Sequence, residues 1–142
     1  MGLKNKKIPS YLWFYIYDED IPFARVYSPS HESSDNSPEG CSSLQLEVYF
    51  ENKKEFKISK EELLEKSIKK LVEMKVIKEE DLIVRDIRFE KYVNVIFDFN
   101  VYEAKTKIRE YLERIGIRTI RRFGEWDYFW SDQSSMSGLK GV

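Results

Sequence analysis

The sequence predicts an α+β fold: a largely antiparallel β-sheet with two helices packed on one face. Three strand-like runs precede the first amphipathic segment, and further strand-like runs flank the second. Strands therefore outnumber the crossover connections that a parallel sheet would need. At 142 residues, the chain is expected to form a single domain, 1–142, and to bury about two-thirds of its unfolded surface.

The first half of the chain supplies the strands. The aromatic and β-branched runs 11–20 and 22–29 predict a hairpin across Asp-Glu-Asp-Ile-Pro. Residues 28–43, rich in Ser, Pro, Asn and Gly, predict a loop, ordered or mobile. In the run 44–50 apolar and polar residues then alternate, which is typical of a half-buried strand.

Two helices are expected. Ser59 and Glu62 form a capping box at the start of the first, and its buried stripe is expected to comprise Leu64, Ile68, Leu71 and Val72. The second covers about 102–115. Its apolar stripe consists of Ala104, Ile108, Tyr111, Leu112 and Ile115, with Gly116 as the residue that ends the helix.

Three further segments predict strands. Residues 82–99 indicate one strand, or two with a break near Glu90 and Lys91, and residues 117–123 indicate a last strand. The run 124–130 favours a final strand that closes the core with its aromatics. The polar run 131–138 that follows begins like a helix, whose N-terminus would suit a phosphate.

Composition excludes several classes of function. With 24 Lys and Arg against 25 Asp and Glu, we expect no nucleic-acid partner. One Cys and one His cannot form a zinc set, so we expect no metal. No apolar run approaches the roughly 18 residues of a membrane span and no signal peptide is evident, so we expect a cytoplasmic location. The high charged fraction is typical of a heat-adapted organism.

Few residues indicate chemistry. Arg25 lies inside an apolar run, where a guanidinium must be paired or face a cavity. Arg121 and Arg122 would point to opposite faces of the predicted strand. His31 and Cys41 lack the orienting group that a nucleophilic pair needs. The spacing of the six glycines does not match G-x-G-x-x-G, so the 142 residues contain no dinucleotide-binding fingerprint.

The order of segments resembles the C-terminal portion of the UDP-galactopyranose mutase and protoporphyrinogen oxidase-like, amine oxidase-type FAD flavoproteins. Residues 116–138, which contain Phe-Gly-Glu-Trp-Asp-Tyr-Phe-Trp-Ser-Asp-Gln, carry the most specific part of the resemblance. Residues 20–30 and 37–50 are similar to the substrate-domain strands of that group. Residues 94–117 are similar to the segment that leads into its final flavin-binding strand.

The resemblance implies a role for each part of the chain. Residues 1–115 would be substrate-domain-like, and 116–142 would form the strand and helix start that contact FAD. The residues implied at the cofactor are Arg122, Phe123, Gly124, Trp126, Asp132 and Gln133. Arg25 would lie on the substrate-domain strands, near the substrate or the flavin edge.

Two departures from the family pattern leave several functions open. Arg121 replaces a glycine that lets the backbone approach the cofactor, and the dinucleotide-binding Rossmann half has no counterpart in these residues. The leading hypothesis is part of an FAD-dependent oxidoreductase or mutase that is inactive alone and is completed by a Rossmann-type partner chain. The alternatives are a non-enzymatic protein-binding or oligomerisation module derived from that fold, with a homo-oligomer as one form, and a small enzyme that uses Arg25, His31 and Asp132.

Overall fold

The protein comprises two compact units. The structure, a computed structural model, describes residues 1–5, 8–50 and 58–141, and its backbone contacts separate into Met1–Arg88 and Phe89–Val142. Each unit is described by itself below. The predicted assignment of 1–115 to a substrate-domain-like part and of 116–142 to a cofactor-contacting part stays a prediction.

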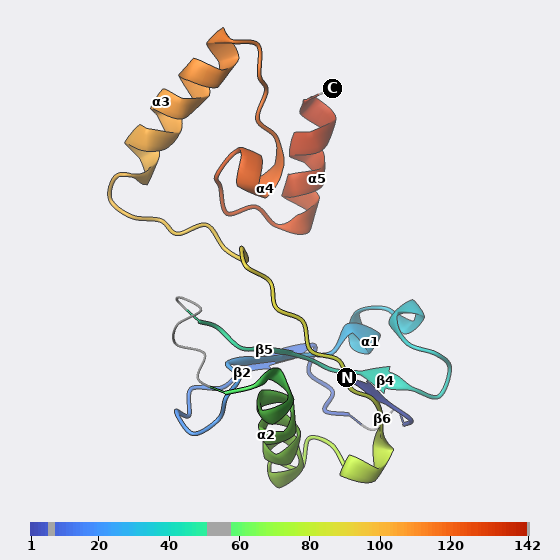
Figure 1. Cartoon of the computed structure of the whole chain (residues 1–142). Helices are drawn as coiled ribbons and strands as arrows, with labels where there is room; N and C mark the ends of the chain where they lie inside the picture. The colour runs from blue at the N-terminus through green and yellow to red at the C-terminus, as the bar shows by residue number, and fades with distance from the viewer. Residues whose placement is uncertain (6–7, 51–57, 142) are drawn as a thin grey trace. The chain divides into compact units, whose positions relative to one another are not determined.

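Short antiparallel strands form two sheets in the first unit (Figure 1). The strands are β1 Gly2–Leu3, β2 Trp13–Tyr15, β3 Arg25–Tyr27, β4 Ser42–Ser43, β5 Gln45–Glu47 and β6 Leu82–Val84. One sheet has the order β4-β1-β6 and the other has the order β2-β3-β5, and every pairing is antiparallel. The α+β class and the predicted hairpin of β2 and β3 are confirmed.

The serine-rich segment 28–43 is ordered by local hydrogen bonds. It contains α1, Pro29–Glu32, and the 3-10 helix η1, Ser34–Asn36, before β4. Proline suits the first turn of α1, where its missing N–H group needs no partner. The segment then continues through β4 into β5. Because β4 pairs with β1 and β5 pairs with β3, residues 42–47 join the two sheets.

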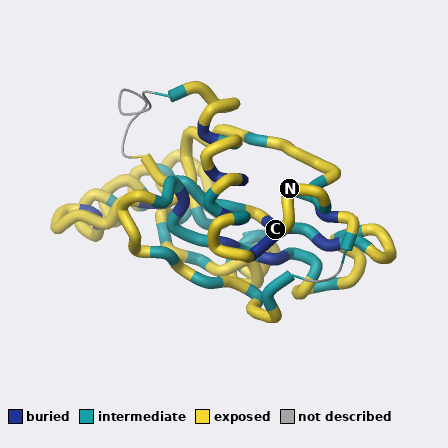
Figure 2. The backbone as a smooth tube through the Cα atoms, turned by 90° about the horizontal axis from the view of Figure 1, so that it is seen from below, coloured by how far each residue is buried: buried dark blue, intermediate teal, exposed yellow. Residues whose placement is uncertain are grey.

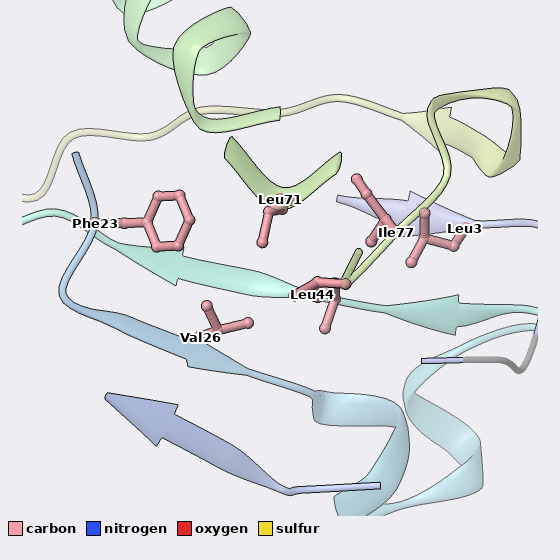
Figure 3. Close-up of a cluster of buried hydrophobic side chains, with 7 residues drawn as sticks. Leu3, Phe23, Val26, Leu44, Leu71 and Ile77 are labelled. Carbon is pink, nitrogen blue, oxygen red and sulfur yellow. The ribbon is translucent and has the colours of Figure 1, made fainter. Parts of the chain in front are cut away.

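Helix α2, Lys60–Glu73, packs on the strands (Figure 1) and begins at the predicted cap. The Ser59 Oγ accepts a hydrogen bond of 3.0 Å from the Glu62 backbone N–H. Leu71 is fully buried, and Figure 3 shows it between Phe23 and Ile77. The cluster consists of Leu3, Phe23, Val26, Leu44, Leu71, Val76 and Ile77.

The buried residues of α2 differ from the predicted stripe at two of four positions: Leu63 and Ser67 are buried, whereas Leu64 and Val72 are only half-buried. Leu63 is 4% exposed, whereas Leu64 is only half-buried. Leu63 precedes the buried residues Ser67 and Leu71 by four and eight positions, which keeps all three on one face. A 3-10 helix, η3 Glu79–Asp81, connects α2 with β6.

The second unit contains α3 Val101–Arg114, α4 Arg121–Gly124 and α5 Ser131–Lys140, and α4 lies beside α5 (Figure 1). Helix α3 confirms the second predicted helix. Gly116 ends it with φ +79°, a left-handed conformation that glycine adopts without steric cost. Helix α3 belongs to this unit, whereas α2 packs on the strands within the first unit.

Three strand predictions were wrong. Beyond β6, the described residues 85–99 form no strand. Within the predicted last strand, residues 121–123 lie in α4 and residues 117–120 form no strand. Residues 124–130 form no strand either. Strand-forming sequences need a ladder partner, and the described part of the chain provides none for these segments. These segments have the composition of strands, but they could form strands only by pairing with a further sheet edge.

Exposed apolar side chains distinguish the second unit. Its fully buried apolar residues, within the described part of the chain, are Val95 and Val101. Four residues of the predicted stripe of α3 are exposed and Leu112 is half-buried, while Met136 and Leu139 of α5 are exposed. Figure 2 shows how few residues of the whole trace are buried, in dark blue, and how many are exposed, in yellow.

Candidate functional site

The predicted cofactor residues gather around α4 and the start of α5. Arg122, Phe123 and Gly124 lie in α4, and Trp126 follows it. The Arg121 backbone N–H, at the start of α4, donates to Ser137 Oγ of α5 at 2.8 Å. This hydrogen bond therefore links the start of α4 to α5.

Arg122 keeps an unsatisfied donor. Its Nη2 donates to Asn94 Oδ1 at 2.9 Å, and its guanidinium lies 4.6 Å from the centre of the Tyr128 ring. The Nε of Arg122 is buried and has no hydrogen-bond partner among the described residues. A buried donor without a partner costs free energy, so this nitrogen is suited to a ligand acceptor.

Phe123 and Trp126 form an aromatic pair. Their ring centres are 6.4 Å apart in an edge-to-face arrangement, and both side chains are more than 40% exposed. Trp126 has φ +50°, which is rare for a bulky residue. The conformation at Trp126 turns the chain directly after α4.

Arg121 adopts the backbone conformation of a glycine, with φ +66°. The family pattern stated above has glycine at this position. Arg121 therefore adopts a left-handed backbone conformation that a glycine would adopt without steric cost. At Gly124, by contrast, an added Cβ would make only ordinary contacts, the nearest at 3.6 Å from the Thr119 carbonyl carbon. Nothing within the described chain therefore requires glycine at position 124.

The first turn of α5 presents Asp132 and Gln133. The Gln133 Oε1 accepts the Trp130 backbone N–H at 2.8 Å, so Gln133 fixes the entry of the chain into the helix. Trp130, at the N-cap, has no side-chain acceptor to cap the helix. The first N–H groups of α5 are thus free of a side-chain cap, while the Asp132 carboxylate lies among them and competes with any bound anion.

Ion pairs from α3 hold the turn that follows α4. Lys105 Nζ lies 2.5 Å from Asp127 Oδ2, and Arg109 Nη2 contacts both the backbone oxygen of Glu125, at 3.0 Å, and its Oε2, at 2.9 Å. Ser137 also donates to Glu125. The hydrogen bond from Lys105 holds the pKa of Asp127 below its usual value. Sequence reasoning missed Lys105 and Arg109, although their four-residue spacing beside the apolar stripe places both on one helix face.

Arg25 belongs to the first unit and is not free. It stands directly opposite Glu47 in the β3–β5 register, with which it forms an ion pair, and opposite Tyr15 on β2. Partial burial and a hydrogen bond to Glu47 raise the pKa of Tyr49 to about 12. Arg25 Nε is buried without a partner in the described chain, so the pair retains one unsatisfied donor.

The remaining candidates have structural partners. His31 Nε2 lies 2.8 Å from the backbone oxygen of Pro9. Residues 1–5, 8–50 and 58–141 contain no group of three or more His, Cys, Asp or Glu placed to hold a metal ion. No helix in the same residues combines the length and apolar character needed to cross a bilayer.

A guanidinium with a free donor and a helix N-terminus without a side-chain cap are donor types that bind the diphosphate of dinucleotides such as FAD. Arg122 provides a guanidinium with a buried, unpartnered Nε, and α5 provides N–H groups without a side-chain cap. Phe123 and Trp126 provide exposed aromatic surface. Asp132 is the residue whose charge opposes such a ligand.

The chain resembles the flavoprotein group expected from the sequence. Among solved structures, the chain is similar to "Crystal structure of reduced UDP-Galactopyranose mutase", with a TM-score of 0.80 and 28% sequence identity. The similarity covers 97% of this chain and 30% of that chain, so these 142 residues span less than a third of the mutase. No protein-family model and no curated protein matches the sequence.

Proposed function

We propose that this chain forms the substrate-domain-like and C-terminal part of an FAD-dependent oxidoreductase or mutase. The observation that carries the proposal is the similarity of nearly the whole chain to 30% of a UDP-galactopyranose mutase. The rest of such a protein, including a dinucleotide-binding fold, would be supplied by a Rossmann-type partner chain or by further sequence. The proposed location is the cytoplasm.

The residues of α4 and α5 would bind and orient the cofactor. Arg122 would donate from Nε and Nη1 to the diphosphate, while Asn94 and Tyr128 hold its guanidinium in place. Gln133, which accepts the Trp130 backbone N–H, would leave the first N–H groups of α5 available to the cofactor. Phe123 and Trp126 would exclude water beside the ligand. FAD itself would supply the electron transfer.

Arg25 would bind the substrate from the outer face of the β2-β3-β5 sheet. Tyr15, Arg25 and Glu47 form one row across the three strands, so their side chains project to the same face. Because Glu47 neutralises Arg25, the guanidinium is held in position and contributes directional hydrogen bonds more than net charge. Its unpartnered Nε is the donor offered to substrate.

The second candidate function is a non-enzymatic module that associates with itself. The exposed apolar residues of α3 favour it, since Ile108, Tyr111 and Ile115 are each more than half exposed. Arg121 in place of glycine also favours it, because a long side chain replaces open space beside the backbone. In this case the aromatic residues after α4 would form an interface.

Affinity capture of the tagged full chain from its own organism tests both candidates. We expect a co-purifying chain whose sequence contains G-x-G-x-x-G and a released flavin identified as FAD by mass spectrometry. Arg122→Gln should lower the flavin content while keeping the partner. Arg88→Gln, which removes an exposed ion pair with Asp86 in the other unit, is the matched control and should retain the flavin.

A self-associated chain without flavin would replace the enzyme proposal by the interface proposal. A strictly monomeric chain across a concentration series, with neither partner nor flavin, would contradict both. Equal flavin content in wild type and Arg122→Gln would remove Arg122 from the cofactor site.

A further inference from the structure

We propose that Arg118 and Arg121 together bind a phosphate group on the last turn of α5. This site differs from the one assigned to Arg122 and does not depend on the proposed flavin. Two features carry the inference: a pair of guanidinium groups without carboxylate partners, and a strained backbone that is kept at one of them.

The positive charges of residues 118–122 are not compensated. Within the described part of the chain, neither Arg118 nor Arg121 forms an ion pair, whereas Lys105 and Arg109 of the same unit do. The carboxylate of Glu125, at the end of α4, is already engaged by Arg109 and Ser137. The two arginines therefore carry charge that a ligand can neutralise.

Contacts with two glycines place both arginines at the last turn of α5. Arg118 Nη1 donates to the backbone oxygen of Gly141 at 3.3 Å. The Arg121 side chain lies over Gly138, where an added Cβ would be 3.4 Å from Nε and 3.8 Å from Nη2. Positions 138 and 141 are three residues apart, which is about one helical turn. An anion bound at this turn would therefore meet both guanidinium groups.

The backbone at Arg121 indicates a role for its side chain. A residue with a Cβ at φ +66° is disfavoured by about 1 kcal/mol relative to glycine. Residues held in such conformations cluster at ligand-binding sites, where the side chain offsets the strain. A glycine would fit the backbone better, so the guanidinium is the feature that an arginine adds.

The chemistry of the pair selects phosphate. Guanidinium groups bind phosphate oxygens with paired hydrogen bonds, and two of them match a doubly charged anion. The backbone oxygens at the end of α5 are the negative end of the helix dipole and oppose any bound anion, so binding depends on the two guanidinium groups. The phosphate could belong to free inorganic phosphate or to a diphosphate ligand.

Titration of the full chain with inorganic phosphate, pyrophosphate and ADP, followed by amide NMR at constant ionic strength, tests the site. We expect shifts at residues 118–122 and 137–141. Arg121→Gly should weaken binding by roughly tenfold, as expected for the loss of a charge-assisted contact. Because glycine relieves the backbone strain, this variant should remain folded, so weaker binding cannot be attributed to unfolding.

The control is Arg114→Gln, which removes the same charge from the same unit at a guanidinium that lies over the Tyr111 ring. It should leave binding unchanged. Tighter binding by Arg121→Gly would show that the side chain blocks the anion, and equal weakening by Arg114→Gln would reduce the effect to net charge. Either result, or no binding by the wild type, overturns the inference.

Stronger binding of pyrophosphate and ADP than of phosphate identifies a diphosphate source. The reverse order identifies free phosphate, and neither order depends on flavin content.

Discussion

Leu63 and Leu64 of α2 provide a sharp test of the fold, because they are adjacent, chemically identical and differently buried. Leu63 is 4% exposed, whereas Leu64 is half-buried. Truncation of a buried leucine to alanine costs about 2–5 kcal/mol, since it removes buried methyl groups and leaves a cavity. We expect Leu63→Ala to cost about 3 kcal/mol and Leu64→Ala to cost less than about 1.5 kcal/mol.

The assay is a urea titration of the full chain, followed through the amide NMR signals of residues 58–88 so that the second unit does not contribute. A unit of this size has a stability of only about 4–13 kcal/mol, so the difference between the variants is readily measured. Equal losses, or a larger loss for Leu64→Ala, would mean that α2 is rotated from the orientation described and that the predicted stripe was right.

Two predictions concern pH. The pKa of Asp127 is lowered in the fold by the hydrogen bond from Lys105, so its contribution to stability is present above the unfolded pKa and is lost as pH falls through the lower, folded pKa. Acid titration of the wild type should show this loss and Lys105→Gln should not; matching curves would contradict the role of the ion pair. The phenol of Tyr49 should ionise near pH 12 in an ultraviolet titration, and Glu47→Gln should lower that pKa. An unchanged pKa in the variant would exclude Glu47 as a cause.

Local signals predicted α2 and α3 well. Ser59 and Gly116 mark helix ends because a cap and a left-handed glycine act through neighbouring backbone groups, and the structure confirms both. The hairpin of β2 and β3 was predictable for the same reason. A strand within a sheet depends on distant partners, so residues 85–99 and 117–120 could not be assigned from their own composition.

The candidate site was predictable only in part. The sequence placed Asp132 and Gln133 at a helix start, and α5 confirms that position. The contacts of Lys105 and Arg109 with the turn after α4 were not predictable, because they depend on how α3 meets a segment about 20 residues further along the chain. Polar contacts of this kind leave no periodic pattern in the sequence.

In the second unit, polar residues make many of the internal contacts and apolar residues are exposed, which is unusual for a domain that is stable alone. Lys105, Arg109 and Ser137 make its internal contacts, while Ile108 and Leu139 are exposed. Surface ion pairs contribute little to stability, and hydrophobic burial normally supplies most of it. A unit with this arrangement gains stability chiefly by covering its apolar faces. Both proposed functions require such a cover, and the identity of the covering surface, a Rossmann-type chain or a second copy, is what separates them.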